Sequence, residues 1–506
     1  MATPSALRQF TYFPELVSMV VLFYCSRSSS DPTCRSVNVP RSVCHRWKDC
    51  VERTPELWSS LSMTVSMPLE IRSLFPATNI LAIYDGTDRW ARPYKDTVDR
   101  YLERCGRFPL NLFIDSPGDD EYYGLTLARE KLLNFFFDHL ANNISRIGTL
   151  SVSIEDCPLP TFFKSIEINE HVFNPINFTE LSFGYGSDYE LLALDLSQFG
   201  NLRKFTFYGP SSTYKKRLIF NNTVLQLLPP PRLQELHLHR VFLQWYPDRE
   251  LFATDVRHIT LMCGSLTEDM QPIFHEVFPL VEELSIVRLV AYNTADGCWG
   301  LSLPNVRKLS VALDDWSVLE DFSCPLLSEL EVVEESRHSL RPYDWLDDLD
   351  PIRQFVHNNV SQLQRFSITT RERRLLDVML LLQELPLLRE LHITVVDDGY
   401  RAEEDVKKEC LDYVLDTLTI TDDEGVLAVC PLLTSLHLTD RTDQTYMTAS
   451  AIARMLLSRS ITTPGDENHT ALWELSFTVD QAVVGTVQRS LRYGSVLADE
   501  LSIRVA

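Results

Sequence analysis

The amino-acid sequence predicts an α/β protein in which a small N-terminal helical module precedes a long, irregular solenoid of strand-and-helix units. Three observations lead to this prediction. Two short helical segments, separated by prolines, occupy the first sixty residues. Behind them an apolar triplet of the form Leu-x-x-Leu-x-Leu recurs, and at six places a proline stands two residues before it. Successive triplets between residues 233 and 327 begin 21 to 25 residues apart, which is a spacing typical of repeat proteins.

The composition is that of a globular protein with a large buried core. Of the 506 residues, 45% are hydrophobic and 23% are charged, which is ordinary for a folded chain of this size. The 47 basic residues against 70 acidic residues give a formal net charge of -23. A surplus of negative charge repels phosphate backbones and the anionic surfaces of membranes. We therefore expect no nucleic acid and no membrane among the partners of this chain.

The eleven cysteines are scattered and include no Cys-x-x-Cys pair, so the sequence indicates neither a disulfide framework nor a zinc module. Reduced thiols favour a cytoplasmic or nuclear location. Secretion is the weaker alternative: the apolar run at residues 16–25 resembles the core of a signal peptide, but Glu15 borders it and no clear cleavage site follows it. No apolar stretch reaches the ~18 residues that a membrane span needs.

Prolines and capping residues divide the N-terminal region into two predicted helices. Pro14 suits the first turn of a helix over residues 14–25, because the N–H that it lacks would be unpaired there. Ser42 is a good N-cap for a second helix, which Pro55 ends. A short apolar turn that is expected to close over both helices follows: Leu57, Trp58 and Leu61. We expect the module to span residues 10–62.

Stretches of this region resemble a known family. Residues 42–49 read Ser-Val-Cys-His-Arg-Trp-Lys-Asp and residues 54–61 read Thr-Pro-Glu-Leu-Trp-Ser-Ser-Leu. Both are similar to the second half of fungal, basidiomycete-type F-box domains. Residues 12–16, Tyr-Phe-Pro-Glu-Leu, match the usual start of that family in part. Residues 101–112, Tyr-Leu-Glu-Arg-Cys-Gly-Arg-Phe-Pro-Leu-Asn-Leu, resemble the segment that follows the box in many such proteins.

The resemblance implies that the module docks on the Skp-type linker subunit of a cullin-RING ubiquitin ligase. Carried over by position, Pro14 and Leu16 would form the entry loop of the docking surface. The second helix would contribute Val43, Cys44 and Trp47. An alternative stays open for the tryptophans at positions 47 and 58, because at these spacings tryptophans are more often core residues of a helical hairpin than contact residues.

The repeated unit of the remaining chain combines a proline with a short strand. The last two apolar residues of each triplet alternate as they would on a strand with one buried face, and the proline would end a preceding helix. After residue 327 the spacing lengthens, which favours fuller helices at residues 350–359, 402–418 and 448–458. Six prolines begin such units: Pro231, Pro279, Pro304, Pro325, Pro386 and Pro431.

The interval between units suits a leucine-rich repeat, and the region resembles the leucine-rich repeats that commonly follow an F-box. The Asn or Cys that this family places three residues after its last leucine is replaced here, for example by Val241 and Arg441, so we expect an irregular solenoid. It would form a substrate-recognition domain at residues 140–506, behind a connecting region at residues 63–139. A doubly wound α/β domain is the alternative, because it has the same alternation of strands and helices.

Motifs for catalysis, cofactors or metals are not evident. The sequence has no phosphate-binding loop, no nucleophile elbow and no His-Glu-x-x-His helix, so we expect neither an enzyme nor a cofactor. His237 and His239 share one face of a predicted strand and could bind a metal, but solvent-facing polar residues are the commoner case. The surface expected to face a substrate consists of Thr206, Tyr208, His237, His239, His392 and His437.

Together these patterns predict a substrate-recognition adaptor of a Skp-cullin-F-box ubiquitin ligase, which recruits a target protein while its partners supply catalysis. One alternative is a leucine-rich-repeat interaction scaffold that does not engage the ligase. Another is a hydrolase on an α/β sheet, which would need a cleft with a nucleophile and a base within reach. The sequence does not indicate which protein is the substrate.

Overall fold

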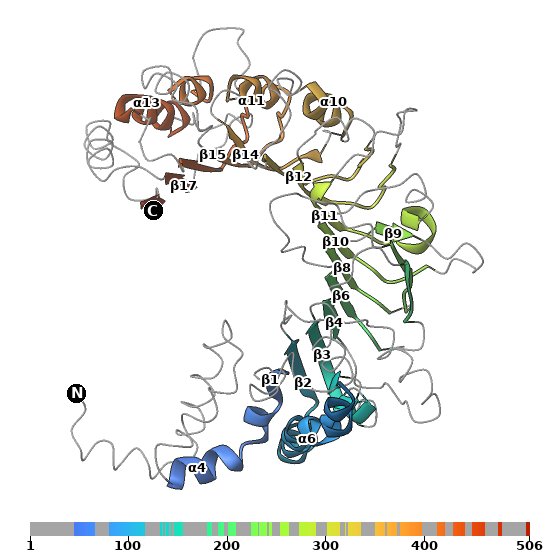
Figure 1. Ribbon diagram of the computed structural model, residues 1–506. Coiled ribbons are helices and arrows are strands. Elements are labelled where there is room, and N and C mark those ends of the chain that lie inside the picture. The colour runs from blue at the N-terminus through green and yellow to red at the C-terminus, as the bar shows by residue number, and fades with distance from the viewer. Residues whose placement is uncertain are drawn as a thin grey trace, which may run out of the picture. The chain divides into compact units, whose positions relative to one another are not determined.

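A computed structural model of the chain divides into two compact units, Met1–Val256 and Arg257–Ala506. Each unit is built on parallel β-sheet (Figure 1). The structure describes residues 45–65, 80–116, 132–133, 135–136, 138–140, 143, 146–154, 180–184, 191–196, 201–208, 224–230, 232–239, 242–244, 253–262, 273–289, 301–313, 319, 322–334, 350–359, 362–371, 375–396, 412–419, 429–440, 448–460, 474–477 and 502–505.

The first unit contains two parallel sheets. One has the strand order β1-β2-β3-β4-β6-β8, and the other has the order β5-β7-β9. Its strands are β1 (Ser60–Thr64), β2 (Leu110–Ser116), β3 (Ile147–Ile154), β4 (Glu180–Gly184), β5 (Leu191–Asp195), β6 (Lys204–Tyr208), β7 (Val224–Leu228), β8 (Glu235–His239) and β9 (Phe242–Gln244). In-register pairing brings buried leucines of neighbouring strands together, as with Leu61, Leu112 and Leu150.

Described helical residues of the first unit lie before β1, between β1 and β2, and at residues 132–140 between β2 and β3. They include α4 (His45–Glu52), the short 3-10 helix η1 (Pro55–Trp58) and the long helix α6 (Ile80–Cys105). Gly106 follows α6 with a φ of 62°, the left-handed conformation that commonly ends a helix. The Arg146 guanidinium donates hydrogen bonds to the carbonyls of Leu102 and Gly106, so a side chain from before β3 binds the otherwise unpaired helix end.

The predicted helical fold of the N-terminal module is wrong. Residues 10–44 lie outside the described residues, and the rest of the module comprises α4, η1 and the strand β1, which pairs with β2. The physical reason is a period of two in the apolar residues: Leu61, Met63 and Val65 are all buried, and the residues between them are not. Alternation of this kind places one face of a strand in a core, so Leu61 belongs to a sheet rather than to a turn over two helices.

The second unit contains an all-parallel sheet of nine described strands, which pair in chain order from β10 to β18 (Figure 1). The pairing is in register along this sheet, with one shift between Val287 and Leu289. The strands are β10 (His258–Met262), β11 (Glu283–Leu289), β12 (Lys308–Leu313), β13 (Glu329–Glu334), β14 (Arg365–Arg371), β15 (Glu390–Val396), β16 (Ser435–Asp440), β17 (Glu474–Phe477) and β18 (Ser502–Val505).

The prolines of the repeated unit lie in tight turns that lead into these strands. At Pro325, for example, the Leu327 N–H donates to the Cys324 carbonyl at 3.0 Å, which places proline at the second position of a four-residue turn. Proline favours that position because its fixed φ matches the turn. Corresponding backbone hydrogen bonds enclose Pro279, Pro304, Pro386 and Pro431. The predicted order of proline followed by strand is therefore confirmed in the second unit.

Helices of the second unit lie between strands. They include α10 (Asp350–Asn359), α11 (Leu375–Leu382), α13 (Ala449–Ser460) and a single π turn, η3 (Ile273–Val277). The predicted helix at residues 350–359 is confirmed as α10, and the one predicted at residues 448–458 is confirmed as α13 within two residues. Of the helix predicted at residues 402–418, residues 412–417 are described and helical.

The predicted solenoid is wrong. The described residues have an α/β fold with few helices: the second unit contains an all-parallel sheet of nine strands, and the first unit contains the parallel strands β1-β2-β3-β4-β6-β8 and a separate three-stranded parallel sheet. The reason for the error is that the proline turn and the apolar triplet are local features. They require only that a buried parallel strand follows a tight turn, and this requirement is met by any α/β sheet with short connections.

Candidate functional site

The exposed face of the nine-stranded sheet displays polar side chains in straight rows. In β15 the residues Leu391, Ile393 and Val395 are buried, whereas those between them are at least partly exposed. Strand residues alternate between the two faces, and in-register pairing aligns equivalent positions of neighbouring strands. Each row therefore has one residue from every strand that it crosses. Two rows have a distinct chemistry, one from β10 to β15 and the other from β10 to β17.

The first row, which we call the charge row, alternates in sign from strand to strand. Glu283 of β11 lies 3.2 Å from His258 and 3.9 Å from Lys308. Arg365 of β14 lies 3.0 Å from Glu329 and 2.8 Å from Glu390. The charge row consists of His258, Glu283, Lys308, Glu329, Arg365 and Glu390.

Hydrogen bonding to Glu390 and the nearby charge of Glu329 raise the pKa of Arg365 above its usual value. These side chains are substantially exposed, so each ion pair stabilises the fold only weakly. The alternation of charge has a second effect. If any strand of the row exchanged places with its neighbour in the sheet, two side chains of like charge would become adjacent. The charge row therefore favours a single strand order and has little net charge of its own.

The second row, which we call the hydroxyl-imidazole row, lies two residues further along each strand, on the same face of the sheet. Ser310 donates a hydrogen bond to Glu331 at 2.9 Å. His392 and His437, on neighbouring strands, lie with their ring centroids 4.1 Å apart in an edge-to-face arrangement. The hydroxyl-imidazole row consists of Thr260, Ser285, Ser310, Glu331, Ser367, His392, His437 and Ser476. Hydroxyls and imidazoles both donate and accept hydrogen bonds, so this row can bind the polar groups of a protein partner.

A serine and a histidine lie within hydrogen-bonding distance in this region. The Ser435 hydroxyl is 2.9 Å from Nε2 of His437, which is the contact that a nucleophile and its base would make. The Ser435 N–H donates to the Arg389 carbonyl at 2.9 Å as part of the sheet, so it cannot donate to an oxyanion. The ring of His437 also faces the His392 ring rather than an orienting carboxylate. The geometry favours a structural contact over a catalytic pair.

The first unit brings together the other four residues of the predicted substrate-facing surface. Thr206 of β6 is in register with His237 of β8, and Tyr208 is in register with His239. Thr206 is buried, whereas both histidines are half-buried. The Tyr208 side chain is not among those described. The predicted face-sharing of His237 and His239 is confirmed, because Leu236 and Leu238 between and beside them are buried.

His237 forms part of a small charged network. Its Nε2 lies 3.4 Å from Glu235, and Lys204 lies 3.1 Å from the same carboxylate. Partial burial opposes ionisation of Glu235, but hydrogen bonds from Lys204 and His237 outweigh it and lower the pKa of Glu235 below its usual value. His237 is thus a partly shielded partner of a carboxylate rather than a free surface ligand.

The residues predicted to bind the linker subunit lie mostly outside the described part of the chain. This holds for Pro14, Leu16, Val43 and Cys44, and Trp47 lies in α4 with its side chain undescribed. The described side chains of α4 that face solvent are His45, Lys48 and Asp49. The roles assigned to the docking residues stay predictions.

The apolar turn after α4 is anchored on the long helix α6. Trp58 is only 2% exposed, and its ring lies 5.0 Å from that of Tyr101 in an edge-to-face arrangement. The Arg104 guanidinium lies 4.3 Å from the Trp58 ring centroid and 3.7 Å from Glu52 of α4. Trp58 is therefore a core residue, but it packs against α6 and not within the predicted helical hairpin. Arg146, which binds the end of α6, carried no sequence signal because its partners lie about forty residues away in the chain.

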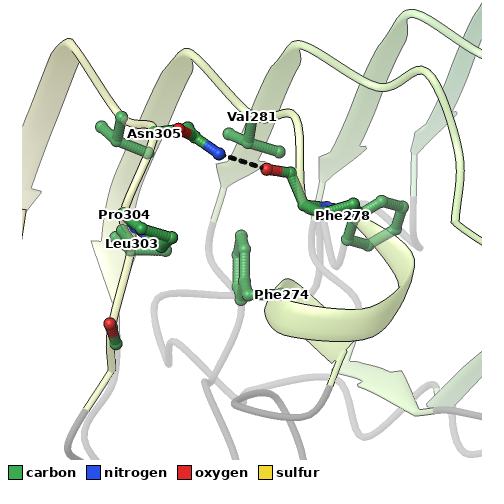
Figure 2. A pocket seen from close by; sticks show the side chains of 9 residues that line it. Phe274, Phe278, Val281, Leu303, Pro304 and Asn305 are labelled. Atoms are coloured by element: carbon green, nitrogen blue, oxygen red, sulfur yellow. Dashed lines mark hydrogen bonds between the residues drawn. The ribbon is translucent and has the colours of Figure 1, made fainter.

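Two other features of the second unit are structural in character. A cavity lined by Phe274, Phe278, Leu303 and neighbouring residues has a volume of about 10 Å³ (Figure 2), which is room for about one water molecule. Asn305 bridges the two turns beside it by donating to the Pro279 carbonyl at 2.7 Å. A cavity of this size cannot contain a small-molecule substrate, for which several hundred Å³ are usual.

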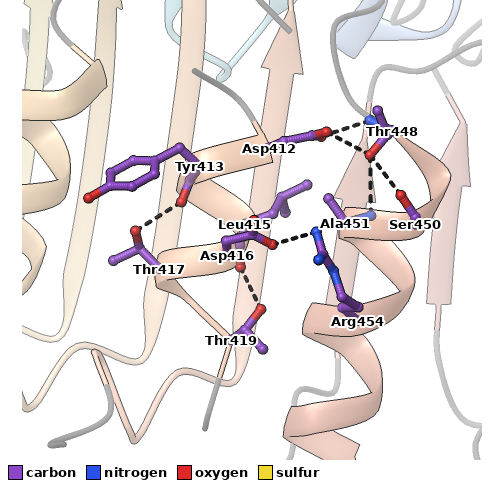
Figure 3. Close-up of polar contacts among 10 residues, drawn as sticks. All are labelled: Asp412, Tyr413, Leu415, Asp416, Thr417, Thr419, Thr448, Ser450, Ala451 and Arg454. Atoms are coloured by element: carbon purple, nitrogen blue, oxygen red, sulfur yellow. Dashed lines mark hydrogen bonds and ion pairs between the residues drawn. The ribbon is translucent and has the colours of Figure 1, made fainter. Parts of the chain in front are cut away.

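The second feature is a polar contact between the helix at residues 412–417 and α13 (Figure 3). Asp412 accepts hydrogen bonds from the Thr448 N–H at 2.9 Å and from the Thr448 hydroxyl at 2.7 Å. Thr448 in turn accepts from the Ala451 N–H and so caps α13, and Asp416 pairs with Arg454 at 2.9 Å. These carboxylates are occupied in joining two helices.

The described buried thiols of the second unit are not poised as nucleophiles or ligands. Burial raises the pKa of the Cys324 and Cys430 thiols to about 12, so neither is a thiolate at neutral pH. In this part of the chain no cluster of three or more His, Cys, Asp or Glu side chains has a metal-binding arrangement. No described helix combines the length and the apolar character that crossing a membrane requires. Comparison with known protein families and with curated proteins finds no match to this chain.

Proposed function

We propose that this chain is a substrate-recruiting adaptor of a Skp-cullin-F-box ubiquitin ligase. The observation that supports the proposal best is that the two family-like stretches, at residues 42–61 and 101–112, pack against each other. They meet through the contact of Trp58 with Tyr101 and Arg104, and through the pairing of β1 with β2. A resemblance in two unconnected stretches of sequence is weak support for a family. Two such stretches that pack against each other in one structural element support it more strongly.

In this proposal the N-terminal region and the sheet faces have different roles. The N-terminal region up to α4 docks on the Skp-type linker subunit, with the exposed side of α4 available to a partner. The hydroxyl-imidazole row of the second unit offers donors and acceptors to a target protein. Catalysis of ubiquitin transfer resides in the other ligase subunits. The adaptor would act in the cytoplasm or nucleus, where such ligases work and where its buried thiols stay reduced.

The test is binding of the purified full-length chain to a purified Skp-type linker subunit, measured by co-purification and by calorimetry. Trp47→Asp and Leu16→Asp each place a charge in the predicted contact, and we expect each to weaken binding about thirtyfold or more, as for an interface hot spot of about 2 kcal/mol. Tyr413→Asp is the matched control, because Tyr413 is 53% exposed on a helix of the second unit. Failure of the unmodified chain to bind the linker subunit would overturn the proposal.

A second candidate function has one observation in its favour. Leu57 and Trp58 of η1 and Leu61 of β1 are all buried, and these two elements contact α6 and β2, so these apolar side chains are not available to a linker subunit. That burial favours a protein-interaction scaffold that does not engage the ligase. The scaffold is supported instead if the chain binds target proteins but not the linker subunit.

A further inference from the structure

The turns that lead into the second unit's sheet expose leucines at one repeated position. Leu280, Leu326 and Leu387 each follow the proline of a turn, and they are 43%, 36% and 42% exposed. Leu432 follows Pro431 in the same way and is half-buried. At the alternate strands β12 and β14, the corresponding exposed residues are the amides Asn305 and Gln362. We call this line of residues the leucine edge.

The leucine edge has a regular spacing. Leu280, Leu326 and Leu387 precede β11, β13 and β15, which are separated by one intervening strand each. Two residues beyond the turn positions, backbone hydrogen bonds join neighbouring units, as where the Ser328 N–H donates to the Arg307 carbonyl at 2.8 Å. These bonds give successive turns the same spacing as the strands. Parallel strands lie about 4.8 Å apart, so successive leucines of the edge lie ~9.6 Å apart.

That spacing excludes a β-strand as the bound segment, because an extended peptide repeats one face every ~6.7 Å or ~13 Å. A polyproline II segment repeats one face every ~9.3 Å, and a proline-rich peptide in the binding assay described below would detect it. A helix laid along the edge returns to nearly the same face every seven residues, or about 10.5 Å. A helix with apolar residues seven positions apart therefore fits the leucine edge.

The charge beside the leucine edge is locally positive, although the chain as a whole has a formal charge of -23. Arg307 and Arg389 lie two residues beyond the turn positions Asn305 and Leu387, are both exposed, and make no ion pair with any described residue. Glu282, which occupies the same position before β11, is neutralised by Arg257 at 2.6 Å. Two guanidiniums beside an apolar line would attract carboxylates.

We propose that the leucine edge binds an acidic amphipathic helix of a partner protein, whose apolar residues lie seven positions apart and whose carboxylates face Arg307 and Arg389. Apolar residues of the helix cover Leu280, Leu326 and Leu387, which is the helix-in-groove mode of recognition applied to a row of turns. The inference deepens the proposed function by naming the class of segment that the adaptor would recruit. It rests on the proposed function only in taking the partner protein to be a target of the ligase.

The test uses a fluorescein-labelled synthetic helix with three leucines spaced seven residues apart on a Glu- and Ala-rich background, and fluorescence anisotropy with the full-length chain. One control peptide has the same composition with the leucines spaced five apart, and another has Lys in place of Glu. We expect the acidic, seven-spaced peptide to bind about tenfold more tightly than either control and to weaken as salt is added.

Variants of the chain locate the binding site. Leu326→Ala and the double change Arg307→Glu with Arg389→Glu should each weaken the acidic peptide about fivefold or more, and the charge reversal should favour the Lys peptide instead. Leu380→Ala is the matched control, because Leu380 is 47% exposed on α11 and lies outside the leucine edge. All these residues are exposed, so circular dichroism should show unchanged folding.

Equal binding of the three peptides, or equal losses for Leu326→Ala and Leu380→Ala, would overturn the inference. The linker-subunit assay is run on the same variants and should be unaffected by them. A chain that binds the peptide but not the linker subunit contradicts only the proposed function. A chain that binds the linker subunit but none of the peptides contradicts only the leucine-edge proposal.

Discussion

Replacement of Arg459 by methionine should destabilise the second unit by about 3 kcal/mol. Arg459 lies in the last turn of α13, is 1% exposed, and donates hydrogen bonds to three backbone carbonyls. Its guanidinium lies 2.7 Å from the Leu418 carbonyl, 2.7 Å from the Val429 carbonyl and 3.1 Å from the Cys430 carbonyl. It thus joins the end of the helix at residues 412–417 to the turn that precedes β16. Cys430 in that turn has a φ of 49°, so the turn is held in a conformation that a side chain seldom adopts.

Two opposing effects determine the magnitude. Methionine fills a similar volume but removes the Arg459 donor from the Leu418 and Val429 carbonyls, at about 1 to 3 kcal/mol each. It also removes the charged hydrogen bond to the Cys430 carbonyl, which keeps its bond from the Leu433 N–H, at about 1.5 to 3 kcal/mol. Against this, burial of the guanidinium lowers the pKa of Arg459 to about 10. A depression of that size corresponds to about 3 kcal/mol of unfavourable desolvation that methionine would relieve. The lost hydrogen bonds exceed this relief, and the net effect is a loss of about 3 kcal/mol.

The assay is thermal unfolding of the full-length chain followed by circular dichroism, with urea unfolding as a second measure. For a unit of this size, about 3 kcal/mol lowers Tm by about 6 to 12 °C. The matched control is Arg454→Met in the same helix, because Arg454 is 60% exposed and forms an ion pair with Asp416. The control should cost less than about 1 kcal/mol. Equal losses for the two variants would refute the assignment of Arg459 as the residue that joins these segments.

Three further predictions concern other buried or shielded groups. Asn359→Leu should lower the free energy of unfolding in urea by about 2 to 4 kcal/mol, because Asn359 accepts from the Cys324 N–H at 2.5 Å and donates to the carbonyls of Phe355 and Phe322. His357 is exposed on the same helix, so His357→Leu should lower it far less. Similar losses for the two variants would contradict this account. Lys204→Met should bring the pKa of Glu235 back toward its usual value of 4.5 in an NMR titration, because Lys204 helps to lower it. Since that pKa is lower in the folded state, the stability that Glu235 contributes is fully present above pH 4.5 and is lost as the pH falls through the folded-state pKa. A Glu235 titration that the substitution leaves unchanged would show that Lys204 does not act on Glu235. Cys324 and Cys430, whose pKa burial raises to about 12, should resist a thiol reagent at pH 8 until the protein is unfolded, and rapid labelling of the folded chain at either residue would contradict their burial.

Local features of the fold could be predicted from the sequence, because they depend on neighbouring residues alone. The turn at Pro325 and the strand that follows it are one example, and the helix at residues 350–359 is another. Proline and apolar alternation act over a few residues, so their patterns identify turns and strands directly. The same patterns cannot determine how many strands join one sheet, which is why the predicted solenoid was wrong.

Long-range features of the candidate site could not be predicted in the same way. The signs of the charge row alternate only when Glu283, Lys308 and Glu329 are aligned across three strands, and this register is not visible in a single sequence. Arg459, Asn359 and Arg146 look like surface residues in the sequence because charged and amide side chains are mostly exposed. Arg459 and Asn359 are nevertheless buried and Arg146 is half-buried, because each binds backbone groups about thirty to forty residues away in the chain. By contrast, His392 and His437 occupy equivalent positions in their units, and their juxtaposition was predictable from that equivalence.

The most direct test of the proposed adaptor function is hydrogen–deuterium exchange of the full-length chain with and without a purified Skp-type linker subunit. Docking should slow exchange in the N-terminal region and in the α4 amides, residues 45–52, and should leave the amides of the nine-stranded sheet unchanged. Protection confined to the second unit, or exchange that is the same with and without the linker subunit, would contradict the proposal that this chain recruits targets to a ubiquitin ligase.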